Sequence, residues 1–158
     1  MPYHRKGYSV LTIKDLSITR GQGEQSFTVS LPHLSLAEGE VVSLCGSSGC
    51  GKSTLLEMMG LILKPDNLSQ YELSSDTLSM DLAPLILSNN QKTLAEIRSK
   101  NLGFMLQNGG LLPFLSVWQN ILLPCQTNGI LADESWLHHL CEKLNINHLM
   151  TKYPKQLN

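Results

Sequence analysis

The sequence is poor in charged residues and nearly neutral. Asp, Glu, Lys and Arg make up 16% of its 158 residues, against about 25% in typical globular proteins. Its 12 basic and 13 acidic residues give a net charge of −1 with neutral histidines. Such a chain exerts no broad attraction on nucleic acid or anionic lipid, so we expect no nucleic-acid partner. Hydrophobic residues make up 42% of the chain, which excludes a disordered composition and supports one core.

Cysteine pairs and long apolar runs are also missing. The four cysteines, Cys45, Cys50, Cys125 and Cys141, form no CxxC pair and match no zinc-ligand spacing. We therefore expect buried thiols in a reducing compartment rather than disulfides or a metal site. No apolar stretch approaches the roughly 20 residues that span a membrane, and the N-terminal residues do not resemble a secretory signal. The sequence predicts a cytoplasmic protein that meets a membrane only through a partner.

The hydrophobic pattern predicts an α/β fold. Alternation predicts strands at 9–13 and 27–31. Leu16 and Ile18 continue the first pattern, and Leu34 and Leu36 resume the second past Pro32. Short apolar runs at 41–45 and 102–106 are typical of buried parallel strands. The less regular segment 66–92 is interpreted as loops with short strands at 71–73 and 85–87. Helices are predicted at 52–63, 93–100, 117–123, where Pro124 limits the helix, and 134–144, where Asp133 is the N-cap.

A glycine-rich loop separates the apolar run 41–45 from the predicted helix at 52–63. Residues 46–53 fit the G-x-x-x-x-G-K-[ST] pattern in full. Glycines let backbone N–H groups surround phosphate oxygens, and the helix adds its positive N-terminal end. In this pattern Lys52 reaches the β- and γ-phosphates, and Ser53 holds Mg²⁺ through its hydroxyl. The predicted phosphate-binding residues are Gly46, Ser47, Ser48, Gly49, Cys50, Gly51, Lys52, Ser53 and Thr54.

The alternative interpretation of this loop is an ordinary glycine-rich turn. It requires a chance match to the whole pattern, and by residue frequency such a match is rare in a chain of this length. The match also lies where the mechanism needs it, after an apolar run and before an amphipathic helix. Phosphate binding is therefore the favoured interpretation.

The residues around the loop resemble one family of P-loop proteins. Gly39-Glu40 before the apolar run and Ser-Thr-Leu-Leu at 53–56 are similar to the Walker A region of the ATP-binding cassette subunits of ABC transporters. Leu-Gly-Phe-Met-Leu-Gln at 102–107, with Leu-Leu-Pro at 111–113 and Val-Trp-Gln-Asn-Ile at 117–121, resembles the family's Q-loop segment. By that resemblance Gln107 contacts Mg²⁺ and the attacking water, and its loop faces the transmembrane subunit. The plainer alternative for Gln107 is a polar residue that closes a strand.

The C-terminal residues extend the resemblance. Tyr-Pro-Lys-Gln-Leu-Asn at 153–158 is similar to the segment that leads into the family's signature motif, of which Asn158 would be the first residue. The sequence of the Q-loop segment is most similar to that of the lipoprotein-release and macrolide-export type. The resemblance, over residues 9–158, implies a RecA-like P-loop NTPase core with an N-terminal antiparallel β subdomain. It places the β subdomain and P-loop core at about 1–107 and the start of a helical subdomain at about 108–158, truncated before the signature motif.

The resemblance implies an ATPase subunit of a transporter. It would bind ATP and Mg²⁺, with Lys52 and Gln107 as catalytic residues and Ser53 and Gln107 at the metal. Its partners would be transmembrane transporter subunits and a second ATPase subunit, in a homo- or heterodimer on the cytoplasmic face of the membrane. The Walker B Asp, the catalytic Glu, the signature motif and the switch His of the family are not found in the sequence.

Three other functions stay open. A nucleotide-binding module without turnover is the interpretation that we favour for the 158-residue chain by itself. Another P-loop NTPase, such as a small kinase or GTPase, conflicts with the Q-loop resemblance. An interaction protein without nucleotide would require the phosphate-loop match to be chance.

One feature departs from the family's pattern, and two others resemble functional sites without meeting their requirements. Residues 17–21 hold no aromatic residue where the family stacks on adenine, and a solvated Arg20 is a plainer interpretation than a stacking one. Ile-Leu-Ala-Asp-Glu at 130–134 imitates a Walker B ending but lacks the apolar strand, so we interpret Asp133 as a helix N-cap. His138 and His139 are adjacent on a predicted helix and cannot form a metal pair at i, i+4. They are interpreted as surface or half-buried side chains.

Overall fold

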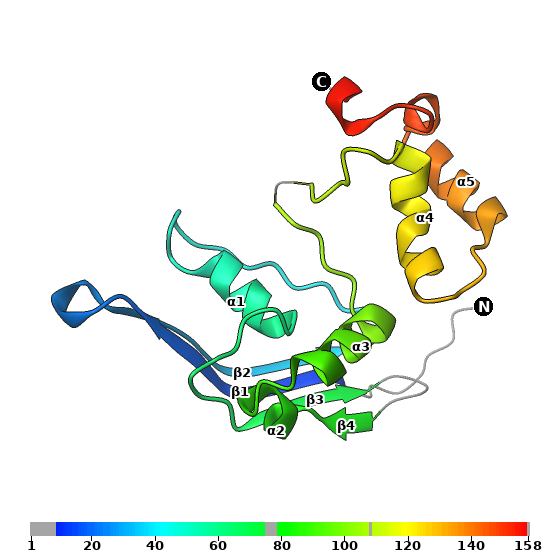
Figure 1. Cartoon of the computed structure of the whole chain (residues 1–158). Coiled ribbons are helices and arrows are strands. Elements are labelled where there is room, and N and C mark those ends of the chain that lie inside the picture. The colour runs from blue at the N-terminus through cyan, green and yellow to red at the C-terminus, as the bar shows by residue number, and fades with distance from the viewer. Residues whose placement is uncertain (1–8, 75–78, 108, 158) are drawn as a thin grey trace. The chain divides into compact units, whose positions relative to one another are not determined.

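The computed structural model describes residues 9–74, 79–107 and 109–157. The chain divides into two compact units, Met1–Leu102 and Gly103–Asn158. Figure 1 shows the strands together with α1, α2 and α3 in the first unit, and α4 and α5 in the second.

The first unit is built on a four-stranded sheet with the order β2-β1-β3-β4. Every strand pair is antiparallel, which confirms the strands predicted at 9–13, 27–31 and 71–73. The two strands of the first hairpin include the positions where the pattern continued, Leu16 and Ile18 in the first and Leu34 and Leu36 in the second. The short 3-10 helix η1 (Gly23–Gln25) joins them. The strands are β1 (Ser9–Arg20), β2 (Phe27–Ala37), β3 (Gln70–Ser74) and β4 (Ser79–Asp81).

An irregularity in β1 decides which side chains enter the core. Asp15 has a φ of 53°, in the left-handed region. The register of the β1–β2 pair is the same on both sides of it, since Lys14 lies opposite His33 and Leu16 opposite Leu31. Left-handed backbone is not extended, so the strict alternation of side chains is interrupted at this residue. Ile13 and Leu16 are consequently both buried, although strict alternation would place them on opposite faces.

Three helices complete the first unit: α1 (Lys52–Met59), α2 (Ala83–Leu87) and α3 (Gln91–Asn101). The helix predicted at 93–100 is confirmed as α3, and the Asn90 side chain accepts a hydrogen bond from the Thr93 N–H at its start. The predicted helix at 52–63 is too long, since α1 ends at Met59 and Leu61 has a φ of 58°. A left-handed residue at this point ends an α-helix.

The strand predicted at 85–87 is wrong, because these residues form most of α2. The Asp81 carboxylate accepts hydrogen bonds from the backbone N–H groups of Tyr71 and Ala83, both at 3.0 Å. It therefore joins β3 to the first turn of α2, where Pro84 suits a helix start. A short apolar run is compatible with either a strand or a helix. Here the Asp81 hydrogen bond and Pro84 in the first turn favour the helix.

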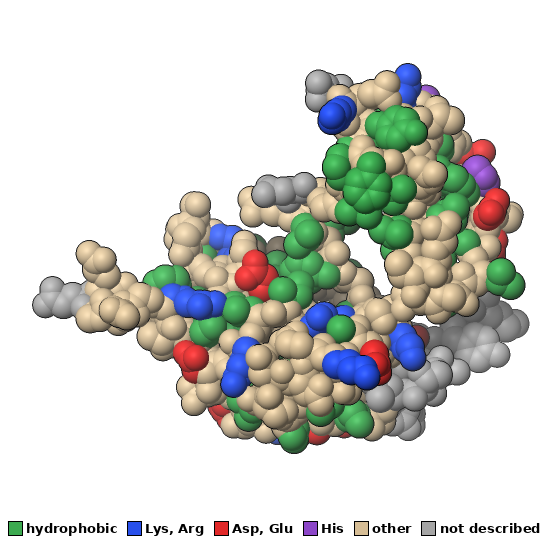
Figure 2. All heavy atoms as spheres, viewed as in Figure 1, with side chains coloured by type: hydrophobic (Ala, Val, Ile, Leu, Met, Phe, Trp, Pro, Cys, Tyr) green, Lys and Arg blue, Asp and Glu red, His purple; other side chains and the backbone are tan. Residues whose placement is uncertain are grey.

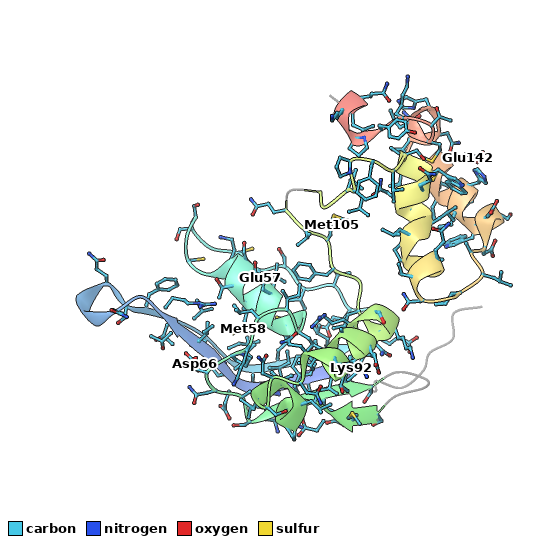
Figure 3. All side chains as sticks on the ribbon, in the orientation of Figure 1. Glu57, Met58, Asp66, Lys92, Met105 and Glu142 are labelled. Carbon is cyan, nitrogen blue, oxygen red and sulfur yellow. The ribbon has the colours of Figure 1, made fainter. Side chains whose placement is uncertain are left out.

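One continuous hydrophobic core joins the three helices to the sheet. Met58, labelled in Figure 3, is 1% exposed and enters this core from α1. The core contains side chains from all three helices and from β1, β2 and β3: Ile13, Leu16, Ile18, Val29, Leu55, Met58, Leu61, Leu68, Tyr71, Leu73, Leu82, Ala83, Ile86 and Leu94.

The parallel strands predicted at 41–45 and 102–106 are not formed. Residues 40–47 and 102–106 are neither helical nor extended in a sheet, and Val41 and Met105 are 93% and 92% exposed. An apolar run of this kind becomes a buried strand only between neighbouring strands. No segment of the residues that the structure describes pairs with either run, so both remain loops.

The second unit contains α4 (Val117–Thr127), α5 (Glu134–Lys143) and the 3-10 helices η2 (Asn147–Leu149) and η3 (Pro154–Gln156). A capping box formed by Ser116 and Gln119 begins α4. The expected limit at Pro124 is wrong, since the helix continues to Thr127. Near this end the side chains of Thr127 and Asn128 donate to the Pro124 carbonyl, which helps to satisfy the last turn.

The second unit has little interior. Among its described residues only Val117 and Cys141 are buried hydrophobics. Figure 2 shows apolar side chains gathered on the visible surface of this unit. Several large hydrophobic side chains of the unit are exposed, and Phe114 is 71% exposed. Its last segment is fastened to α4, because the N–H groups of Val117 and Trp118 donate to the carbonyls of Lys152 and Met150. In the described parts of both units, no helix has the length and apolarity needed to cross a bilayer.

Candidate functional site

The loop at 46–51 leads directly into α1. Gly51 is the N-cap residue, with φ 95° and ψ 10°, and Lys52 is the first helical residue. Gly49 also has a positive φ, 79°, a region that L-residues with side chains seldom adopt. The glycines therefore occupy positions where the loop reverses direction. The predicted loop and helix are present, and the strand predicted before them is not.

Gly51 also packs closely against the sheet. A Cβ atom at this position would lie 2.4 Å from Cγ2 of Val29 on β2 and 3.2 Å from Cγ1. Val29 is itself buried. The first turn of α1 thus packs on β2 at a distance that only glycine permits.

The Lys52 side chain folds back over the loop. Its ammonium donates to the Gly46 carbonyl at 2.9 Å and to the Ser47 carbonyl at 2.7 Å. It also lies 3.6 Å from the Cys50 thiol sulfur. One cation therefore joins the first residues of the loop to the helix that follows it. The arrangement places a positive charge beside a helix N-terminus, where the first N–H groups have no partner within the helix.

The remaining predicted phosphate ligands are exposed or half-buried. Ser47, Ser48 and Ser53 are exposed, and Thr54 is half-buried. Within the loop the Cys50 N–H donates to the Ser47 carbonyl at 3.4 Å. Backbone N–H groups, a lysine ammonium and a serine hydroxyl at a helix start are the donor set that fits a polyphosphate with Mg²⁺.

Two side chains that the sequence did not reveal hold the other end of α1. The Tyr71 hydroxyl, from β3, donates to the Met59 carbonyl. The Arg98 guanidinium, from α3, donates to the Leu61 carbonyl. Tyr71 is fully buried, and this burial raises the pKa of its hydroxyl well above the usual value. The only sequence signal was a tyrosine in a short alternating strand, which indicates burial but no partner.

Gln107 lies at an exposed turn in the second unit, whereas the phosphate loop belongs to the first. Farther along, the segment 112–116 is held by Asn120 of α4. The Asn120 side chain accepts from the Leu112 N–H at 2.8 Å and donates to the carbonyls of Leu112, Leu115 and Ser116 at 3.2, 3.1 and 2.9 Å. This side chain gives the segment that leads into α4 a defined shape.

The cysteine prediction is partly wrong. All four cysteines are free, and Cys141 is buried as expected, but Cys45 and Cys50 are exposed and Cys125 is half-buried. Cys45 is exposed because the run 41–45 has no strand beside it within the described residues. No group of three or more potential metal ligands occurs in the described ranges.

The Walker B-like run at 130–134 and the adjacent histidines have structural roles. The Asp133 side chain accepts from the Trp136 N–H at 3.0 Å and caps α5, as predicted. Leu131, just before it, is 98% exposed, so the Walker B strand is absent there. His138 and His139 are exposed and stack on different rings, Trp118 and Trp136, with centroid distances of 4.6 and 5.6 Å.

Comparisons with known proteins agree on one family. A family model described as "ABC transporter" matches residues 30–157. The lipoprotein-releasing system ATP-binding protein LolD of Cytophaga hutchinsonii is 34% identical over 126 residues, which cover 78% of this chain and 53% of that protein. LolD of Leptospira interrogans is 34% identical over 143 residues, which cover 90% of this chain and 55% of that protein.

A solved structure supports the same relationship. The dimeric post-hydrolysis state of the ATP-binding cassette MJ0796, bound to ADP and Pi, is similar with a TM-score of 0.70 and 27% identity. The match covers 94% of this chain and 63% of that chain. It confirms the predicted α/β fold class of the P-loop NTPases. The chain spans about half the length of the curated relatives that it matches first.

Proposed function

The chain belongs to the ABC transporter family of ATP-binding proteins, which confirms the resemblance seen in its motifs, and on this premise we propose that it binds MgATP at the loop 46–54. The observation that carries the proposal is the folded loop itself. The Lys52 ammonium spans the loop through the Gly46 and Ser47 carbonyls. The following helix begins with N–H groups that have no partner within the helix.

Each residue of the loop has a proposed task. The N–H groups of Gly46, Ser47, Ser48, Gly49, Cys50, Gly51 and Thr54 bind phosphate oxygens. The Lys52 ammonium donates to β- and γ-phosphate oxygens in place of the Gly46 and Ser47 carbonyls. Hydrogen bonds between two charged groups are stronger than those to a neutral carbonyl. Ser53 holds Mg²⁺ through its exposed hydroxyl. Bound Mg²⁺ supplies neutralisation of charge on the phosphates.

We further propose that the nucleotide site serves transport. The similar proteins include ATP-binding proteins of lipoprotein-releasing systems and a dimeric cassette. By analogy, the chain acts with transmembrane subunits and a second ATPase subunit on the cytoplasmic face of a membrane. Gln107 contacts Mg²⁺ and the attacking water in that assembly. ATP hydrolysis by the assembly then drives movement in the membrane subunits.

A second candidate is nucleotide binding without turnover by the 158-residue chain. The specific observation in its favour is Asp133, the acidic residue in the Walker B-like run, whose carboxylate is occupied as the cap of α5. The two candidates share the phosphate loop and differ in hydrolysis. Measuring binding and turnover on the same protein separates them.

The test is replacement of Lys52 by alanine, with Lys92→Ala as the matched control. Lys92 is an exposed lysine on α3 of the same unit (Figure 3), so its replacement makes the same charge change away from the loop. Hydrogen bonds to charged groups contribute about 1.5–3 kcal/mol, so Lys52→Ala should weaken binding of a fluorescent ATP analogue by about 10-fold to 150-fold. Lys92→Ala should bind as the wild type does.

The outcomes are distinct. Absence of Mg²⁺-dependent nucleotide binding by the wild type would refute a nucleotide function. Phosphate release by the wild-type chain that disappears in Lys52→Ala would exclude the candidate without turnover. Binding without phosphate release would support it.

A further inference from the structure

We infer that Tyr71 and Arg98 are positioning residues for the phosphate loop, which they control through the opposite end of α1. This inference rests on the proposed nucleotide binding and names two residues outside the loop that set its geometry. Their hydrogen bonds are to Met59 and Leu61, at the end of α1 that lies opposite the loop, and α1 carries Lys52 and Ser53.

The anchors at the end of α1 come from two separate elements. Tyr71 on β3 donates to the Met59 carbonyl, 12 residues earlier in the chain. Arg98 on α3 donates to the Leu61 carbonyl, 37 residues earlier. The last carbonyls of a helix, that of Met59 among them, have no partner within it, so donors from outside determine how they are satisfied. Leu61 follows two residues after the helix ends, at the left-handed residue that turns the chain away. The sheet and α3 therefore hold the same end of α1.

The other end of α1 is held by contact. Gly51 packs against Val29 of β2 so closely that no Cβ atom fits between them. Between the two ends, Leu55 and Met58 enter the hydrophobic core. An eight-residue helix is only about 12 Å long. A displacement at Met59 is consequently transmitted to the N–H groups of the first turn.

The hydroxyl of Tyr71, rather than its ring, is the group that matters for this position. The ring packs in the core at 0% exposure, where phenylalanine would fit equally well. The hydroxyl alone reaches the Met59 carbonyl. Phenylalanine at this position would remove the anchor and keep the packing, and methionine at position 98 would remove the second anchor.

The structure offers a matched control for loss of stability. Ile13 lies directly opposite Tyr71 in the β1–β3 pair and is also 0% exposed, but it has no contact that anchors α1 by a hydrogen bond. An Ile→Val replacement in a core and the loss of one hydrogen bond lower stability by amounts of the same order. Ile13→Val therefore lowers stability by a similar amount without releasing the helix end.

The experiment compares Tyr71→Phe, Arg98→Met, Ile13→Val and the wild-type chain. Affinity is measured with a fluorescent ATP analogue and Mg²⁺, well below the melting temperature of each variant. Hydrogen exchange is measured for the amides of residues 52–55. We expect Tyr71→Phe and Arg98→Met to weaken binding by about tenfold, the effect of about 1.4 kcal/mol, and to speed exchange at the first turn of α1. Ile13→Val should leave affinity and exchange as in the wild type.

The possible results separate this inference from the proposed function. If the wild type binds nucleotide and Tyr71→Phe and Arg98→Met bind it with the same affinity, the inference is overturned and the proposed nucleotide binding stands. An equal loss of affinity in Ile13→Val would assign the effect to stability and also overturn it. If Tyr71→Phe does not fold, Arg98→Met decides. No binding by the wild type would overturn both the function and the inference.

Discussion

Replacement of Gly51 by alanine tests the junction between the phosphate loop and the sheet. Gly51 has a φ of 95°, and its Cβ would lie 2.4 Å from Cγ2 of Val29. Both methyl carbons of valine branch directly from its Cβ, so they have few rotamers with which to avoid the new atom. Either the helix start or β2 must therefore move.

The magnitude follows from two separate costs. Left-handed backbone costs an L-residue about 1–2 kcal/mol relative to glycine, and overpacking of a core costs about 1–3 kcal/mol. Gly51→Ala should therefore destabilise the first unit by about 2–5 kcal/mol, a large share of the 5–15 kcal/mol that is typical of a whole domain. Gly49 isolates the first cost, because its φ is 79° and nothing lies within 4 Å of a Cβ placed there. Gly49→Ala should cost only about 1–2 kcal/mol.

The assay is amide hydrogen exchange in β1 and β3, because it reports on the first unit alone. Trp118 and Trp136 are the two tryptophans, and both belong to the second unit, so tryptophan fluorescence does not serve here. The double variant Val29→Ala, Gly51→Ala removes the close contact. The destabilisation of this double variant should be smaller than the summed destabilisation of the two single variants by about 1–3 kcal/mol.

Two results would refute this reasoning. Gly51→Ala could prove no more destabilising than Gly49→Ala, in which case the contact with Val29 has no energetic effect. Alternatively, the two changes at positions 29 and 51 could be additive, in which case the contact is not the origin of the destabilisation.

Two further predictions concern single side chains. Asn120→Ala should destabilise the second unit by about 1–3 kcal/mol, because the Leu112 N–H and three carbonyls lose a partly buried partner. Urea unfolding followed by tryptophan fluorescence measures this, since Trp118 and Trp136 both lie in the second unit, and an unchanged midpoint would contradict it. For Tyr71, burial raises the hydroxyl pKa above its usual 10.0, so the folded state holds this proton more tightly than the unfolded state. The resulting stability is complete below pH 10.0 and is lost as pH rises above it. The alkaline decline in stability should be shallower in Tyr71→Phe, and identical slopes for both proteins would contradict the assignment.

Local patterns in the sequence predicted much of the first hairpin and of the candidate site. Alternation indicated β1 and β2, and the glycine pattern indicated a loop that enters a helix at Lys52. The N-cap Asp133 was also recognisable, because a cap depends on residues only three positions apart. These features need few contacts from elsewhere in the chain.

Predictions that depended on distant neighbours were less successful. An apolar run such as 41–45 indicates a strand only where other strands flank it, and the described residues provide none. The run 85–87 is equally suited to a strand or a helix, and the Asp81 carboxylate at the start of α2 made it helical. The alternating pattern also did not indicate the left-handed residue Asp15, on either side of which Ile13 and Leu16 are both buried.

The amino-acid sequence was sufficient to indicate the family, which the family model confirms. It also predicts phosphate binding, because the order of glycines, lysine and serine that defines this pattern lies within nine neighbouring residues, 46–54. How the loop is held became evident from the folded chain alone. The hydroxyl of Tyr71, the guanidinium of Arg98 and the methyl groups of Val29 reach α1 from three different elements. Such contacts depend on packing between segments far apart in the chain, and no local pattern records them.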